Sequence, residues 1–163
     1  MKKRSFLKIL PVFVAGAQLS LGSGAFAKAR PLVDVWKDPE CGCCKDWVKH
    51  LEDSGFDVRV HDSGNTAARA RLGIPAKLGS CHTAEVGGYA VEGHVPARDI
   101  QSLLAKRPKA IGLGVPGMPV GSPGMDGPIY GKRKDAYDVL LVKADGSTSI
   151  FKSYFSNFFS TIS

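Results

Sequence analysis

The sequence lacks the patterns that define several common function classes. No stretch interleaves basic with aromatic residues, so nucleic-acid binding has little support despite a formal net charge of +7. No Ser/His/Asp set suited to nucleophilic catalysis is recognisable. The run Gly112-Leu113-Gly114 lacks the strand-to-helix context of a phosphate-binding loop. These absences argue against nucleic-acid-binding proteins, nucleotide-binding proteins and serine hydrolases.

Long apolar runs are also missing. The stretch from Phe6 to Leu21 is interrupted by Lys8 and Pro11 and falls short of the roughly 20 residues that a membrane span needs. It follows the basic start Met1-Lys2-Lys3-Arg4 and precedes Ala25-Phe26-Ala27, an A-x-A cleavage pattern. This order predicts a cleaved export signal over residues 1–27, and hence an exported mature protein with no stable membrane insertion after cleavage.

The export signal leaves two routes open. Lys3-Arg4-Ser5-Phe6-Leu7-Lys8 is similar to a twin-arginine signal with Lys3 at the first arginine position, and the general secretory route remains the alternative. Four cations of the leader contribute to the net charge of +7, so the mature protein is much less basic. Residues 28–154 are sufficient for a single domain with its own core, and residues 155–163 form a tail without a recognisable pattern.

Cysteine is scarce and unevenly distributed. Three of the four cysteines lie in Cys41-Gly42-Cys43-Cys44, and the fourth is Cys81. Cys41 and Cys43 form a C-x-C pair, which suits a soft metal ion, while Cys41 and Cys44 form a C-x-x-C pair, which suits a metal ion or a reversible disulfide. Two structural disulfides are common in exported proteins. Here they would require one bond within the cluster and one to Cys81, since only one of the three clustered thiols can pair with Cys81, and adjacent Cys43 and Cys44 pair poorly with each other.

The local pattern predicts where this cluster lies. Residues 32–36 alternate as a strand does, and Asp38-Pro39-Glu40 ends that strand. Apolar residues then recur at i, i+3, i+4 and i+7, which predicts a helix that starts near the cluster and ends at Ser54-Gly55; they are Cys44, Trp47, Val48 and Leu51. The unpaired N–H groups and the dipole of a helix start favour thiolate over thiol. We expect Cys44 to point inward and Cys41 and Cys43 to lie nearer the rim.

The remaining pattern predicts an α/β fold. We expect a strand at 56–61, a short helix at 66–72, a hairpin formed by 80–84 and 89–92, a helix from about 96 to 107, a long loop at 110–131, and a hairpin formed by 137–142 and 149–151. This order is typical of a thioredoxin-like mixed sheet with flanking helices, to which the C-terminal hairpin is an addition.

The residue types near the cluster favour soft metals. Thiolates select Cu(I), Zn(II) or iron–sulfur clusters. Zn(II) needs about four ligands in a tetrahedron, which adjacent Cys43 and Cys44 serve poorly, whereas Cu(I) takes fewer ligands and accepts bridging sulfur atoms. Met118 and Met125 are the only methionines outside the leader, and both lie in the long loop. They are candidate secondary Cu(I) ligands, and the alternative is that each fills a gap in the core.

The four histidines differ in their prospects as ligands. For His50 and His61 a solvated or helix-capping role is favoured over ligation. His82 follows Cys81 directly, so the two can share a metal only if the strand that contains them is broken, because neighbouring strand residues point to opposite faces. His94 lies where the chain leaves the hairpin, and it is either an outer ligand or a loop histidine with satisfied hydrogen bonds.

Several motifs occur together over most of the mature chain. They are Cys41-Gly42-Cys43-Cys44, Gly73-Ile74-Pro75, Ser80-Cys81-His82-Thr83-Ala84, the run from Tyr89 to Ala97, Pro116-Gly117-Met118-Pro119 and Ser122-Pro123-Gly124-Met125. In these motifs the chain resembles the CopG-like copper-resistance proteins, exported bacterial proteins long filed as a domain of unknown function. The resemblance implies a thioredoxin-like fold and periplasmic copper handling. It also implies a cysteine-bridged multi-copper site at Cys41, Cys43, Cys44 and Cys81, and interconversion of Cu(I) and Cu(II).

Three hypotheses follow. The first is a Cu(I)-binding protein whose four thiolates bridge more than one copper ion and which exchanges copper with other periplasmic copper-handling proteins. The second is a thioredoxin-like thiol–disulfide oxidoreductase that uses Cys41 and Cys44. The third is a structural zinc or disulfide domain. Cys43 favours the first over the second, because a third adjacent thiol invites disulfide scrambling.

Overall fold

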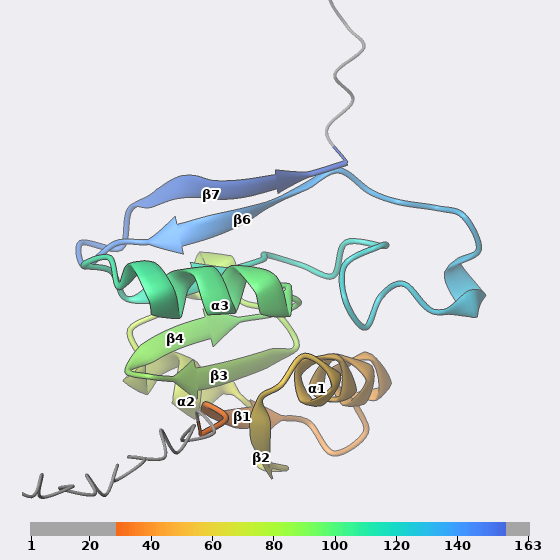
Figure 1. Ribbon diagram of the computed structural model, residues 1–163, viewed down its shortest axis with the longest axis horizontal. Helices are drawn as coiled ribbons and strands as arrows, with labels where there is room; N and C mark the ends of the chain where they lie inside the picture. Colours follow the sequence, from red (N-terminus) through yellow and green to blue (C-terminus); the bar gives the residue numbers. More distant parts are fainter. Residues whose placement is uncertain (1–28, 156–163) are drawn as a thin grey trace, which may run out of the picture.

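A mixed seven-stranded sheet forms the centre of the computed structural model, which describes residues 29–155 (Figure 1). The strand order is β2-β1-β3-β4-β5-β6-β7, in which β1/β2 and β4/β5 are parallel and the other neighbours antiparallel. The strands are β1 (Leu32–Lys37), β2 (Asp57–His61), β3 (His82–Val86), β4 (Tyr89–Glu92), β5 (Gly112–Gly114), β6 (Tyr137–Val142) and β7 (Thr148–Tyr154). The predicted α/β class, with a thioredoxin-like mixed sheet and an added C-terminal hairpin, is confirmed.

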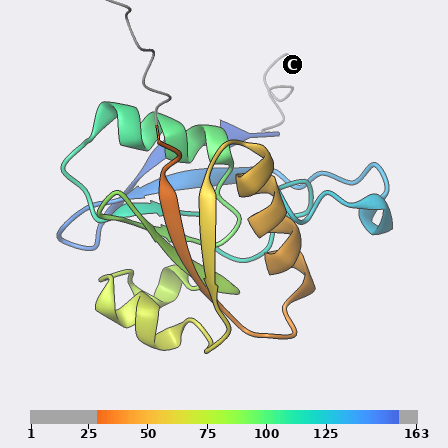
Figure 2. The same cartoon turned by 60° about the horizontal axis from the view of Figure 1, so that its bottom comes forward.

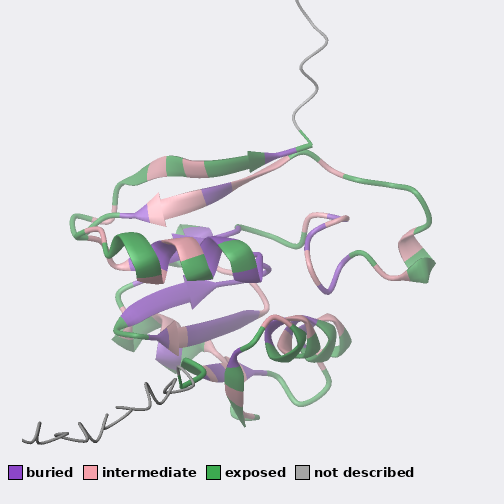
Figure 3. Cartoon of the chain, in the orientation of Figure 1, coloured by how far each residue is buried: buried purple, intermediate pink, exposed green. Residues whose placement is uncertain are grey.

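Helices cover both faces of this sheet. They are α1 (Gly42–Asp53), α2 (Thr66–Arg71) and α3 (Ala97–Lys106), with short 3₁₀ turns η1 (Ala76–Leu78) and η2 (Pro128–Tyr130). The main core joins α1 and α3 to one face, and a smaller cluster around Ile74 and Leu78, after α2, covers the other. Val91 belongs to the first cluster and Ala90 to the second, as side-chain alternation along β4 requires. Figure 2 shows α3 and α2 on opposite sides, and Figure 3 shows the buried strands between them.

The helix α1 forms as its periodicity predicts. Cys44, Trp47 and Leu51, at i, i+3 and i+7, are all fully buried. The indole N–H of Trp47 donates a hydrogen bond to the carbonyl oxygen of Val95, 2.9 Å away, just before α3. This helix therefore has a fixed orientation, and the thiols at its start are held in place.

The segment expected to be a structureless loop contains a strand. We expected no regular element between residues 110 and 131, but β5 and η2 lie there. Glycine is depleted in strands, so the pattern of Gly112-Leu113-Gly114 did not predict one. A Cβ atom on Gly112 would overlap the carbonyl group of Ala90 on β4, so the close approach of the two strands requires glycine.

The rest of this loop packs against the start of α1. A Cβ atom on Gly124 would lie 2.6 Å from the carbonyl oxygen of Cys43 and 2.9 Å from the backbone nitrogen of Trp47. Figure 2 shows the loop (cyan) beside α1. The loop therefore borders the region in which the cysteines lie.

Some predictions fall outside the described residues. The export signal over 1–27 and almost all of the tail over 155–163 are among these, so the division of the chain into signal, domain 28–154 and tail stays a prediction. Within residues 29–155, no helix has the length and apolar character needed to cross a membrane.

Candidate metal centre

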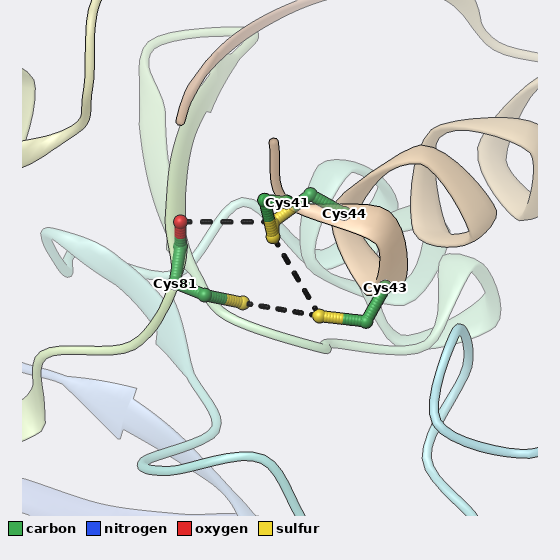
Figure 4. Close-up of side chains that lie close together, drawn as sticks. All are labelled: Cys41, Cys43, Cys44 and Cys81. Atoms are coloured by element: carbon green, nitrogen blue, oxygen red, sulfur yellow. Dashed lines mark hydrogen bonds between the residues drawn. A yellow bond between two sulfur atoms is a disulfide. The ribbon is translucent and has the colours of Figure 1, made fainter. Parts of the chain in front are cut away.

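The fold brings the four cysteines together. Cys41 is the N-cap of α1, Cys43 and Cys44 lie in its first turn, and Cys81 lies in a bend immediately before β3. The four sulfur atoms lie within 4.8 Å of one another (Figure 4). The Sγ of Cys43 is 3.6 Å from the Sγ of Cys41 and 3.8 Å from the Sγ of Cys81. The predicted set of thiols is thus a single cluster in space.

A disulfide joins two members of this cluster. Cys41 and Cys44 are bonded through sulfur, with their Cα atoms 5.3 Å apart, whereas Cys43 and Cys81 are free. The Sγ of Cys44 also lies 3.6 Å from the carbonyl oxygen of Cys81. The structure therefore shows an oxidised form, in which two of the four sulfur atoms need reduction before they can act as thiolate ligands.

The cluster lies at the rim of the core. Cys44 is fully buried, while Cys41, Cys43 and Cys81 are partly exposed, as the helix periodicity led us to expect for the first three. The sulfur of Cys44 is therefore the innermost of the four, and the free thiols of Cys43 and Cys81 are accessible at the rim.

Two electrostatic influences oppose each other here. The start of α1 has no side-chain cap and no acidic residue in its first turn, so its N–H groups and dipole attract negative charge. Burial, together with the neighbouring Cys43, raises the pKa of the Cys81 thiol to about 12. Cys81 is therefore a thiol at neutral pH, and a bound cation would reverse this preference by stabilising the thiolate.

Two histidines adjoin Cys81. Its Sγ lies 3.1 Å from the Nε2 of His94 and 3.4 Å from the Nδ1 of His82. Cys81 and His82 can share a metal ion only if they are not both in a regular strand. This holds, because β3 begins at His82 and leaves Cys81 outside the strand. The Nδ1 of His94 lies 2.9 Å from the carbonyl oxygen of Pro123, which can only accept a hydrogen bond. Nδ1 of His94 therefore carries the proton, and the lone pair of Nε2 faces the sulfur.

The state of these imidazoles suits metal binding. Burial lowers the pKa of His94, and it lowers the pKa of His82 well below its ordinary value. Both imidazoles are therefore neutral at neutral pH. The Nε2 of His82 is buried and has no hydrogen-bond partner among the described residues. A buried nitrogen without a partner is costly unless something else engages it. Once the disulfide is reduced, four sulfur atoms and two neutral imidazoles form a donor set that fits a soft metal ion such as Cu(I).

The other two histidines lie elsewhere. His50, in the last turn of α1, accepts a hydrogen bond from the backbone N–H of Ala97, so it caps α3. His61 contacts Asp34 at 2.7 Å and stacks on Trp36. The capping role favoured for His50 is thus present, whereas His61 contacts Asp34 and Trp36 and caps no helix within the described residues.

Ligation by the two methionines stays a prediction. The sulfur of Met125, which is buried, accepts a hydrogen bond from the hydroxyl group of Tyr130. Met118 is 52% exposed and lines a surface groove with Pro116 and Tyr137. Met125 thus has the contacts of a core residue, while the thioether of Met118 is open to solvent.

Sequence reasoning missed a polar network next to Cys81. The buried carboxylate of Glu92 forms an ion pair with the partly exposed Arg69, and both side chains also bond to the backbone of Ser80. The available signal was a glutamate at the end of an otherwise apolar strand, Tyr89-Ala90-Val91-Glu92.

Known proteins similar to this chain indicate its family. A family model described as "Protein of unknown function, DUF411" matches residues 78–125, which include Cys81 and both neighbouring histidines. A solved structure titled "Copper resistance protein copG- Form 2" is 48% identical, with a TM-score of 0.71, over 77% of this chain and 98% of that chain. This chain belongs to the CopG family of copper-resistance proteins. The Form 1 structure of CopG is 49% identical, with a TM-score of 0.70, over 76% of this chain and 96% of that one.

The resemblance to CopG-like proteins inferred from the motifs is therefore confirmed. A search of curated protein sequences finds no match. The titles of both related structures refer to copper resistance.

Proposed function

We propose that this CopG-family protein binds Cu(I) in the periplasm as part of copper homeostasis and resistance. The observation that carries the proposal is the position of the sulfur atoms of Cys41, Cys43, Cys44 and Cys81, all within 4.8 Å of one another. Copper resistance in the titles of two related structures supports copper as the ion.

The spacing of the sulfur atoms favours more than one copper ion. Cu(I) is satisfied by few ligands, and a thiolate can bridge two ions. Separations of 3.6 Å and 3.8 Å around Cys43 allow its sulfur to bridge ions bound by Cys41 and Cys81. His94 and His82 would supply further ligands beside Cys81. Met118 and Met125 in the long loop are candidate secondary ligands, of which Met118 is open to solvent and Met125 has the contacts of a core residue.

The disulfide gives the cluster a redox partner for copper. Reduction of the Cys41–Cys44 disulfide to two thiols takes up two electrons and two protons, and oxidation of two Cu(I) ions to Cu(II) releases two electrons. The reverse reaction oxidises the two thiols and returns two Cu(I) ions. Interconversion of Cu(I) and Cu(II) at this site is part of the proposal.

Anaerobic titration of the reduced protein tests this function. We expect the wild type to take up more than one Cu(I) ion per chain in competition with a chromogenic chelator, and Cys81→Ser to lower both stoichiometry and affinity. His61→Gln is the control, since His61 lies outside the cluster. Weak binding of at most one ion, unchanged in Cys81→Ser, would contradict the proposal.

A second candidate function rests on the disulfide itself. A C-x-x-C disulfide at the start of α1 is what a thiol–disulfide oxidoreductase requires. Insulin reduction by the copper-free protein separates the two functions. Activity that persists in Cys43→Ser and does not respond to copper would favour the oxidoreductase. Elemental analysis of the exported protein with a thiol count separates both from a structural zinc domain.

Localisation is tested separately. Fractionation of the expressing cells should place the protein in the periplasm, and the mature N-terminus should follow Ala27. Blocking either export route in turn identifies the route.

A further inference from the structure

A carboxylate is buried at the end of β4. Glu92 is fully buried and accepts three hydrogen bonds. Its Oε1 receives the Nε–H of Arg69 at 2.8 Å and the backbone N–H of Ser80 at 2.7 Å, and its Oε2 receives the hydroxyl of Thr83 at 2.6 Å. Such an anion is tolerated in a core only with partners of this kind.

The same network also holds the carbonyl group of Ser80. Its oxygen accepts hydrogen bonds from the Nη2 of Arg69 at 2.6 Å and from the Nδ2 of Asn65 at 3.1 Å. Both backbone polar groups of Ser80 are thus bonded to side chains of this network. A hydrogen bond from its hydroxyl group to the carbonyl oxygen of Gly117 adds the long loop to these contacts.

Ser80 is the residue before Cys81. Because β3 begins at His82, Cys81 itself lies in a bend outside the regular strand. Its sulfur nevertheless lies 3.8 Å from the sulfur of Cys43 and 3.1 Å from the Nε2 of His94. His94 follows Glu92 by two residues, and Cys81 directly follows Ser80. The network is therefore close in sequence to both residues of the Cys81–His94 contact.

Stability alone does not account for the arrangement. A buried ion pair is weak evidence for stability, since removing two charges from water offsets most of their attraction. Here the two charged groups also converge on the backbone of one residue, beside the thiol. Hydrogen-bonded groups outside the ligand set commonly orient metal ligands.

We propose that Arg69 and Glu92 are positioning residues that hold the Ser80–Cys81 bend so that the Cys81 thiol faces Cys43 and His94. As a statement about copper, this inference rests on the proposed function. As a statement about the placement of Cys81, it applies to the metal-free protein.

The test uses Glu92→Gln, which removes the charge that pairs with Arg69 and replaces one acceptor oxygen with a donor. In a Cys43→Ser background with the Cys41–Cys44 disulfide intact, Cys81 is the remaining free thiol. We expect iodoacetamide to alkylate it about fivefold faster, the effect of weakening one buried hydrogen bond. In the reduced protein with all four cysteines, we expect Cu(I) affinity to fall about tenfold or more.

Asp99→Asn is the matched control. Asp99 is a buried carboxylate on α3 that accepts a hydrogen bond from the hydroxyl of Tyr154, 2.7 Å away. We expect this variant to lose stability but to retain the alkylation rate and the Cu(I) affinity of its parent. If Glu92→Gln behaves like Asp99→Asn in both readouts, its role is structural and the inference is overturned.

The test also gives an answer if the variant does not fold or if the wild type binds no copper. If Glu92→Gln does not fold, Arg69→Lys replaces it, because one ammonium group cannot reproduce the fork that reaches both Glu92 and Ser80. The same readouts then decide. If the wild type binds no copper, the proposed function fails, while the alkylation rate of metal-free Cys81 still decides the positioning role.

Discussion

Cys43 lies between the Cys41–Cys44 disulfide and Cys81. Its sulfur is within 4 Å of both Cys41 and Cys81, and it remains free when Cys41 and Cys44 are oxidised. A thioredoxin-like exchange reaction needs the two outer thiols of C-x-x-C, whereas a multi-copper cluster needs a bridging sulfur between them and Cys81. This residue therefore separates the two candidate functions.

Replacement of Cys43 by serine should weaken copper binding without preventing formation of the neighbouring disulfide. We expect Cu(I) affinity to fall by about tenfold or more, because serine cannot bridge two soft ions. Anaerobic competition titration measures the affinity, and mass spectrometry without reductant reports the Cys41–Cys44 bond. Unchanged affinity and stoichiometry would show that Cys43 is not a ligand.

Two contacts join secondary-structure elements around the core. His50, near the end of α1, accepts the N–H of Ala97 at the start of α3, and β5 joins the C-terminal hairpin to β4. The helix α1 was predicted from the spacing of its apolar residues, because a helix pattern depends on residues close together in the sequence. The sequence pattern did not predict β5, because its two glycines carry no strand signal and only the tertiary fit of Gly112 against Ala90 requires a glycine there.

The contact between His50 and Ala97 should make stability depend on pH. Burial lowers the pKa of His50 below 6.5, so on acidification the unfolded chain takes up the proton first. Stability is therefore fully present above about pH 6.5 and is lost as the pH falls through the folded-state pKa. We expect the free energy of unfolding, measured with urea between about pH 7.5 and pH 5.5, to fall less steeply in His50→Gln than in the wild type.

His82 and His94, whose pKa values burial also lowers, contribute with the same sign in both proteins. The difference between the two slopes therefore isolates His50. Equal slopes would show that His50 is not kept neutral by the fold.

The close approach of β4 and β5 makes a second prediction at this level. Gly112→Ala would place a methyl group against the carbonyl of Ala90, so we expect a loss of about 1–3 kcal/mol in unfolding free energy. Gly127→Ala is the control, since no atom lies within 4 Å of the added Cβ. Urea denaturation measures both, and equal stabilities would mean that β5 shifts without cost.

At the scale of the whole molecule, the candidate metal centre lies where three distant segments meet. The start of α1 supplies three sulfur atoms, the bend before β3 supplies the fourth, and the chain after β4 supplies His94. A ligand that binds all three segments binds the folded state and not the unfolded chain, so it should raise global stability.

Copper should therefore stabilise the reduced protein. With free Cu(I) about a thousandfold above the dissociation constant, the expected gain is about 4 kcal/mol, seen as a higher Tm in anaerobic calorimetry. Addition of a Cu(I) chelator should reverse the shift, and Cys81→Ser should show less of it. A Tm that copper leaves unchanged would contradict binding across the three segments.

The sequence by itself determined the start of α1 and its three thiols, the α/β order and the soft character of the donors. These features depend on residue types and on spacings of a few residues, which local physics controls. Only the tertiary structure decided that Cys41 pairs with Cys44, that Cys81 lies outside β3, and that Arg69 and Glu92 hold the bend beside it. Contacts such as Cys43–Cys81 or Arg69–Glu92 join residues far apart in the chain, and they exist only once the sheet has brought those residues together.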